Sequence, residues 1–131
     1  MKKNVNLIAK RKSAVASGVI TDGTGRITIN NKNISAYSDG MMQMMVSEPL
    51  SIAGELAKKY DVDIRVFGGG AMSRAQAIRA VIAKSLARRE KSLKKKFLEY
   101  DRTLLVDDKR MTEPQKPYRS AARALKQTSY R

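Results

Sequence analysis

The sequence predicts an α+β protein, in which a small folded domain at residues 1–106 precedes an extended basic tail at residues 107–131. Apolar and charged residues alternate along residues 62–66, which is the pattern of a half-buried strand. Apolar residues then recur at helical spacing along residues 78–86. Hydrophobic residues make up 42% of the 131-residue chain, which is enough for one domain with a modest core.

Two further segments before residues 62–66 have the composition of strands. Residues 4–21 are extended in character, with apolar residues among small and basic ones. Asp22-Gly23-Thr24-Gly25 is a strong turn signal, and Ile27 and Ile29 alternate with polar residues after it. We therefore expect a β-hairpin across this turn, followed by a polar turn at residues 30–32.

Shorter helices are expected on both sides of the last strand. Residues 35–47 tend to helix, and residues 50–59 form another, with Pro49 suited to its first turn. Residues 93–100 add a further helical turn or two, and a last apolar patch follows at residues 104–106.

The longest helix is expected from Ser73 to about Arg89. Ser73 and Gln76 have the spacing of a capping box at its start. The helix has a core stripe, at Ile78, Ile82 and Leu86. A basic stripe lies on a different arc, at Lys84, Arg88 and Lys91. Such a helix packs on a sheet and presents cations to a partner.

The residue types that the chain lacks exclude several kinds of chemistry. It contains no Cys and no His, so disulfides, Cys or His zinc sites and Ser-His or Cys-His pairs are impossible. The one acidic group worth weighing as catalytic, Asp101 with Asp107 and Asp108, has no partner base or nucleophile by spacing. We expect no enzyme, no cofactor and no metal site. Without a signal peptide or an 18-residue apolar run, we expect a cytoplasmic protein with no membrane partner.

The charge of the chain indicates a polyanionic partner. Lys and Arg number 27 against 12 Asp and Glu, a net charge of +15. Residues 1–66 hold ten basic and six acidic residues, whereas residues 67–131 hold seventeen and six. Residues 110–131 hold six basic and one acidic residue, with Pro114 and Pro117 interrupting regular structure. Such a segment cannot bury enough surface to fold alone, so we expect order only against a partner.

Candidate contacts with RNA phosphates occur at several places, and each has a plainer alternative. Residues 10–12 (Lys-Arg-Lys) are either a solvated edge or a phosphate contact. The glycines at residues 68–70 form either a tight turn without a ligand, a loop that binds an RNA phosphate, or a loop that binds a nucleotide. The cations at residues 88–89 and 94–96 either contact phosphates or form pairs along a solvated helix. The methionines at residues 41–45 favour flexible packing against core or partner over a soft-metal site.

The tail is the most informative segment. Its cations recur every few residues and can follow a phosphate path over tens of ångströms, because an extended chain spans about 3.5 Å per residue. Tyr118 and Tyr130 can stack on bases. The alternative is a disordered tail that only aids solubility.

Five segments together are specific in order and spacing: KRKSAVASGVI at 10–20, GRITINNK at 25–32, the glycines at 68–70 running into SRAQAIRAVIAKSL at 73–86, FLEYDRTLLVDDKRMTEPQKP at 97–117, and QTSYR at 127–131. In these the chain resembles the universal ninth protein of the small ribosomal subunit, the S-nine family, over essentially its full length. The LLVDD stretch and the Ser-Tyr-Arg ending resemble the archaeal and eukaryotic-type branch.

The resemblance implies a small two-layer α/β sandwich of the ribosomal S5 domain 2-like kind with a long extended C-terminal tail. It implies a structural constituent of the small subunit, bound to small-subunit rRNA among neighbouring head proteins. It further implies that the tail reaches the anticodon stem-loop of peptidyl-site tRNA. One departure concerns the tail: members usually have glycines after the Lys-Pro pair, whereas residues 117–123 contain none. The path of the chain near Tyr118 is therefore open.

Charge pattern and resemblance together give the expected contacts. The residues expected to contact rRNA are Lys10, Arg11, Lys12, Gly68, Gly69, Gly70, Arg74, Arg88, Arg110, Lys116, Arg119, Arg123 and Lys126. By position in the family, the residues expected to contact tRNA are Thr128, Ser129, Tyr130 and Arg131, of which the terminal arginine would contact tRNA phosphates. Two other functions stay open on the residues alone: a small phosphotransferase that uses the glycine loop, and a nonspecific DNA-binding protein.

Overall fold

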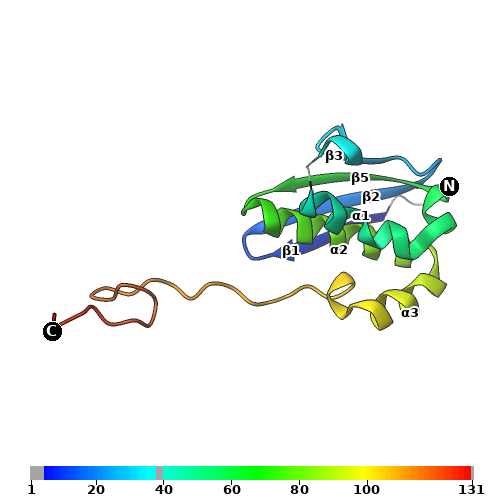
Figure 1. Cartoon of the computed structure of the whole chain (residues 1–131). Coiled ribbons are helices and arrows are strands. Elements are labelled where there is room, and N and C mark those ends of the chain that lie inside the picture. Colours follow the sequence, from blue (N-terminus) through cyan, green and yellow to red (C-terminus); the bar gives the residue numbers. More distant parts are fainter. Residues whose placement is uncertain (1–4, 38–39, 131) are drawn as a thin grey trace.

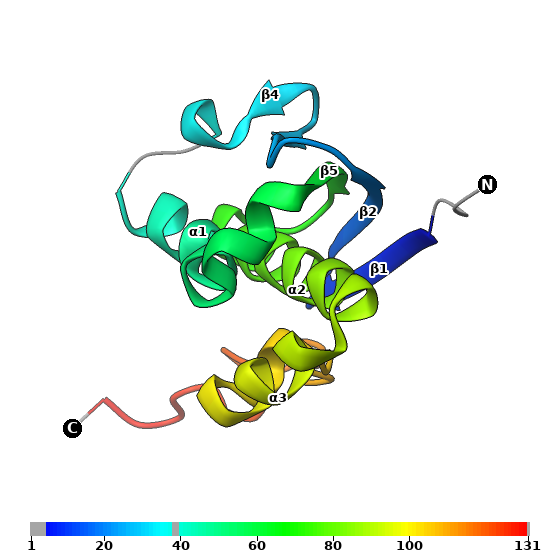
Figure 2. The ribbon, with the colours of Figure 1, turned by 90° about the vertical axis from the view of Figure 1, so that its right-hand side faces the viewer.

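Five strands form one sheet in the computed structural model, which describes residues 5–37 and 40–130. The order across the sheet is β1-β2-β5-β3-β4. The strands are β1 (Val5–Arg11), β2 (Ala14–Asp22), β3 (Ile27–Ile29), β4 (Lys32–Asn33) and β5 (Tyr60–Phe67). Helices cover one face of this sheet (Figures 1 and 2), so the predicted two-layer α+β architecture is confirmed.

The hairpin lies elsewhere than the sequence indicated. Residues 4–21 do not form one strand: the chain reverses at Lys12 and Ser13, and β1 pairs antiparallel with β2. The chain does reverse again at residues 22–26, but β2 and β3 are not neighbours, because β5 lies between them. β3 pairs parallel with β5. The predicted hairpin across residues 22–25 is therefore wrong, since a turn signal fixes where the chain reverses and not which strand becomes the neighbour.

The loop from β2 to β3 is held by a carboxylate of β5. Asp61 Oδ1 accepts hydrogen bonds from the Thr24 and Arg26 N–H groups, at 2.9 and 2.8 Å. Its pKa is lowered, chiefly by these backbone donors. The two isoleucines of β3 are buried beside β5, which explains why so short a strand pairs with a central partner.

The helices are shifted from their expected bounds. They are η1 (Ile34–Ala36), α1 (Met41–Ala53), η2 (Gly54–Lys59), α2 (Ala71–Arg89), α3 (Lys91–Tyr100) and η3 (Arg102–Leu104). Pro49 lies inside α1 rather than in a first turn, and α1 ends at Gly54, whose φ is +58°. The expected helix at 50–59 is thus the end of α1 plus the 3-10 turn η2. The capping box is also wrong, because α2 begins two residues before Ser73, with Gly70 at its cap.

The core lies between the sheet and α2. The predicted stripe of α2 is confirmed, with Ile78, Ile82 and Leu86 fully buried. α1 packs beside α2, and α3 packs on both. In the methionine cluster, Met42 and Met45 pack against the core, whereas Met41 and Met44 are exposed. Core packing therefore accounts for half of the cluster.

The C-terminal segment, residues 107–130, leaves the body beyond η3 and runs away from it as irregular chain (Figure 1). Its start lies beside the end of β1, where Arg11 and Asp108 form an isolated parallel bridge. Farther on, Arg119 faces Leu125 in an antiparallel bridge. Tyr118, Leu125 and Tyr130 are exposed, so this segment adds no large apolar side chain to the core.

Candidate nucleic-acid interface

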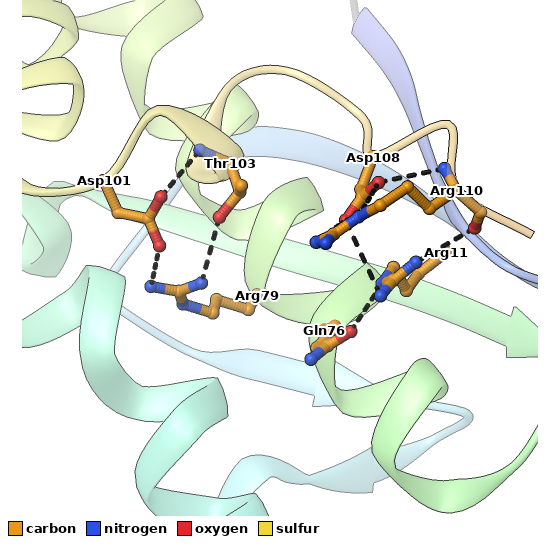
Figure 3. A network of polar contacts seen from close by, with 7 residues as sticks. All are labelled: Arg11, Gln76, Arg79, Asp101, Thr103, Asp108 and Arg110. Carbon is orange, nitrogen blue, oxygen red and sulfur yellow. Dashed lines mark hydrogen bonds and ion pairs between the residues drawn. The ribbon is translucent and has the colours of Figure 1, made fainter.

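Lys10, Arg11 and Lys12 have three different surroundings. Lys10 is exposed near the end of β1, and Lys12 is exposed in the turn to β2, where its φ is +53°. Arg11 points inward instead (Figure 3). Its Nε donates to Gln76 Oε1 at 2.8 Å and its Nη1 to the Arg110 carbonyl at 3.2 Å. Two of these three cations are therefore open to a polyanion, and the third is engaged within the protein.

Two of the three glycines serve close packing. Gly68 and Gly69 have φ of +74° and +66°. A Cβ on Gly68 would lie 2.6 Å from the Ser13 carbonyl oxygen, and one on Gly69 would lie 2.9 Å from the Ala14 nitrogen. Both must be glycine because the end of β5 meets the β1–β2 turn here. Gly70 has open space around it, so an anion has access to the start of α2 at this residue.

Arg74 closes this loop and stays exposed. Its Nε donates to the Gly68 carbonyl at 2.8 Å. The contacts of the loop with the β1–β2 turn and of Arg11 with Gln76 and Arg110 bring segments far apart in sequence to one end of the molecule. We call this surface the basic corner: Lys10, Lys12, Arg74 and Arg110 around the glycine loop. All four cations are exposed.

Other predicted cations lie away from the basic corner. Arg88 is exposed in the last turn of α2, about 20 Å along the helix from Arg74 at 1.5 Å per residue. Lys84, which the basic stripe placed toward a partner, instead pairs with Asp107 at 2.6 Å. The stripe as predicted is therefore wrong at Lys84, because the chain beyond α3 returns along this face of α2.

Each carboxylate of the Asp101, Asp107 and Asp108 group faces a cation. Asp101 pairs with Arg79 at 3.1 Å, and Asp108 with Arg110 at 2.7 Å (Figure 3). Hydrogen bonds from Arg110 hold the pKa of Asp108 far below its usual range. Burial raises the pKa of Asp101, but its bonds to Thr103 and Arg79 outweigh burial and leave the pKa lowered. Asp101 and Asp108 are thus ionised partners in salt bridges rather than proton donors.

The C-terminal segment folds back on Glu113. This carboxylate pairs with Lys116 and with Arg123, each at 2.7 Å, and both cations lower its pKa. Arg119 Nη1 donates to the Arg123 carbonyl at 2.9 Å. Sequence reasoning missed Glu113, although the one acidic residue among six cations was a usable signal. The positions of Lys116, Arg119 and Arg123 are thus coupled to each other.

The segment that lacks the expected glycines has an unusual backbone conformation at Tyr118. Its φ is +61°, a left-handed conformation that glycine adopts freely and other residues rarely do. The chain thus keeps a glycine-like backbone at this point while carrying an aromatic side chain that is 87% exposed. An exposed aromatic ring of this kind has the chemistry to stack on a base.

The last described residues of the chain are exposed. Lys126, Thr128, Ser129 and Tyr130 are all open to solvent, and Arg131 lies outside the described residues. Gln127 Nε2 donates to the Ser129 carbonyl at 2.6 Å. Within the described ranges, no helix has the length and apolar character needed to cross a bilayer.

Comparison with known proteins decides the family. The model described as "Ribosomal protein S9/S16" matches residues 9–131. The chain belongs to this family. It is 41% identical to "Small ribosomal subunit protein uS9" of Methanococcus vannielii over 133 residues, covering 98% of this chain and 99% of that protein. It is 42% identical, with the same coverage, to the protein of that name in Methanococcus maripaludis strain C7.

Family membership confirms two expectations. The resemblance to the S-nine family is correct, and the two relatives are archaeal, in keeping with the LLVDD and Ser-Tyr-Arg signatures. The S9/S16 family is structural and not enzymatic. The phosphotransferase alternative is thereby excluded, in agreement with the packing role of Gly68 and Gly69.

Proposed function

We propose that the chain is a structural constituent of the small ribosomal subunit that binds rRNA and contacts peptidyl-site tRNA during translation. The observation that carries this proposal is the joining of the basic corner to the C-terminal segment at Arg110. Cations of the folded body are thus followed by the cations of the C-terminal segment, at Lys116, Arg119, Arg123 and Lys126. The S9/S16 membership supports the same role.

Residues 1–106 act as the rRNA-binding body and residues 107–131 as the basic tail. Phosphate contacts from the basic corner, Arg88 and the tail cations supply the affinity, and the position in the assembled particle supplies the specificity. The glycine loop admits a phosphate at Gly70. Neighbouring proteins of the small-subunit head are the proposed partners of Met41 and Met44, which are 68% and 74% exposed.

The rRNA role is tested by neutralising the basic corner. The triple variant Lys10→Gln/Lys12→Gln/Arg74→Gln is expected to bind a head fragment of small-subunit rRNA more weakly. The salt dependence of its binding should fall by about two to three units of slope, because each lost phosphate contact removes about one counterion. The control Lys32→Gln/Lys58→Gln/Lys59→Gln has the same charge change at exposed lysines away from the corner.

Two results would contradict this role. Equal salt slopes for the corner variant and the intact chain would mean that the corner touches no phosphate. Equal affinity for rRNA and for duplex DNA of the same length would favour the nonspecific DNA-binding alternative.

The tRNA role is carried by Thr128, Ser129, Tyr130 and Arg131. Deleting these four residues is expected to leave subunit assembly intact, because Thr128, Ser129 and Tyr130 are exposed and the core ends at Leu104. Affinity of reconstituted subunits for peptidyl-site tRNA should fall. Arg131→Gln, which keeps the chain length, separates the lost charge from the lost reach. Equal tRNA affinity of subunits that contain the truncated and the intact protein would contradict this part of the proposal.

A further inference from the structure

Two consecutive carboxylates at the start of the C-terminal segment are each held by a cation of the body. Asp107 pairs with Lys84 of α2 at 2.6 Å, and Lys84 Nζ also donates to the Ile8 carbonyl of β1 at 3.1 Å. Asp108 lies 3.6 Å from Arg11 Nη2 at the end of β1. The segment is thereby tied at one point to both α2 and the edge strand of the sheet.

The cations are themselves fixed by the body. Gln76 accepts from Arg11 Nε at 2.8 Å, and it lies on the same side of α2 as Arg79 and Lys84. Arg79 holds Asp101 at 3.1 Å, one short turn before the buried Leu104. The chain from Asp101 to Asp108 is therefore tethered at three carboxylates, two to cations of α2 and one to Arg11 of β1, with an apolar side chain packed between the tethers.

These contacts differ from ordinary surface ion pairs. The side chains of Arg11, Lys84 and Asp108 are only 17%, 18% and 15% exposed. Exposed pairs contribute little, whereas half-buried charges with several partners are restricted in orientation. Arg11 directs its Nε, Nη1 and Nη2 toward three protein acceptors, so this geometry does not present it to a phosphate.

We propose that Arg11 and Lys84 are positioning residues that hold Asp108 and Asp107 and so fix the direction in which the C-terminal segment leaves the body. The inference rests on the proposed function for its purpose, which is to aim the segment along RNA. The roughly 20 residues beyond Lys109 can reach about 70 Å when extended. A small swing at the anchor therefore moves the tip by many ångströms. A fixed exit also lowers the entropy lost when the segment binds.

The anchor is tested first on the free protein. The chain has no cysteine, so Ser92→Cys on α3 and Thr112→Cys just beyond the anchor can carry the only two spin labels. Both positions are exposed. The intact anchor should give a narrow distribution of label distances. Asp107→Asn/Asp108→Asn should broaden it, whereas Asp63→Asn, the same change at an exposed carboxylate on β5, should not.

Single variants keep the test decisive if the double variant fails to fold. Asp108→Asn alone should broaden the distribution less, and Arg11→Lys, which keeps a cation near Asp108, should preserve more of the narrow distribution than Arg11→Gln. A distribution of the same width in the anchored protein and in every variant would overturn the inference.

Binding to the rRNA head fragment separates positioning from direct contact. Asp107→Asn/Asp108→Asn removes two negative charges, so electrostatics alone predicts tighter binding to RNA. Loss of positioning predicts binding that is weaker by roughly fivefold or more with an unchanged salt slope. Tighter binding would count against the anchor. If the intact chain does not bind the fragment, the proposed function fails, while the label distances still decide whether the exit direction is fixed.

Discussion

Gly18 of β2 lies where α2 packs closely on the sheet. A Cβ at this position would lie 2.4 Å from Val81 Cγ1. Val81 is fully buried, and Ile64 of β5 lies on the other side of the site at 3.5 Å. The absence of a side chain at one residue therefore sets the distance between the two layers of the protein.

Replacing Gly18 with alanine should destabilise the protein by about 1–3 kcal/mol, because an added methyl group overpacks a filled core. Urea unfolding followed by circular dichroism measures the change. The double variant Gly18→Ala/Val81→Ala should recover part of the loss, since it removes the side chain that the new Cβ meets. Unchanged stability of the single variant would show that α2 shifts at no cost.

Sequence reasoning identified the residue types at the site but not their directions. Lys10, Lys12 and Arg74 are exposed as expected. Arg11 and Lys84 were predicted to face a partner, yet both are turned toward carboxylates of the C-terminal segment. Those carboxylates lie 97 and 23 residues away in sequence. Local charge pattern contains no information on such distant pairings, so these directions could not be predicted.

At the scale of elements, α3 and η3 connect the body to the C-terminal segment. Leu93 and Phe97 of α3 are fully buried, and so is Leu104 of η3. The other face of α3 carries the exposed lysines of residues 94–96. This short amphipathic helix depends on packing against α2 and α1, because a helix of ten residues is marginal alone.

Phe97→Ala should destabilise the protein by about 3–5 kcal/mol, as truncation of a buried phenylalanine leaves a cavity. Leu98→Ala is the matched control, because Leu98 is on the same helix but 44% exposed. Chemical denaturation gives both values, and hydrogen exchange shows whether α3 opens before the rest. Equal losses for the two variants would mean that α3 does not depend on its buried face.

The helix stripe and the central strand were predictable because their periodicities are local. The stripe at Ile78, Ile82 and Leu86 and the alternation along β5 both appear as expected. The neighbour of β3 was not predictable, because it depends on the competition between β2 and a strand more than thirty residues later. Helix ends were also missed: α1 ends at Gly54, whose φ is +58°, and α2 begins directly after Gly70 rather than at the Ser73–Gln76 spacing.

At the scale of the whole molecule, the few carboxylates are used as internal counterions. Asp61, Asp101, Asp108 and Glu113 all have lowered pKa values in the folded protein. Three tyrosines have raised pKa values: Tyr37, chiefly through burial, Tyr60, chiefly through its hydrogen bond to Glu90, and Tyr100, chiefly through its bond to Glu48. No histidine or cysteine titrates between these groups.

Stability should therefore be flat between about pH 5 and 9 and fall on both sides. The lowered carboxyl pKa values contribute stability that is fully present above the unfolded values, 3.8 for Asp and 4.5 for Glu, and is lost as the pH falls through the folded values. The raised tyrosine pKa values contribute stability present below 10.0 and lost as the pH rises through the folded values. Thermal unfolding measured as a function of pH tests the stability losses on the acid side and on the alkaline side.

The variant Asp61→Asn tests which carboxyl group causes part of the stability loss at acidic pH. Asp61→Asn removes a titrating group whose bonds hold the loop from β2 to β3, so it should lower stability at neutral pH and make the acid-side loss shallower. A titration step between pH 6 and 7 in the intact protein would contradict the flat region.

The place of β5 between β2 and β3 has a consequence for synthesis. β3 is translated some thirty residues before β5, and synthesis of that stretch takes about two to six seconds at 5–20 residues per second. During that interval β2 lacks its partner β5, and Ile27 lacks its partner Val62. The basic C-terminal segment emerges last and contributes no core residue. The body can thus close before this basic segment leaves the exit tunnel.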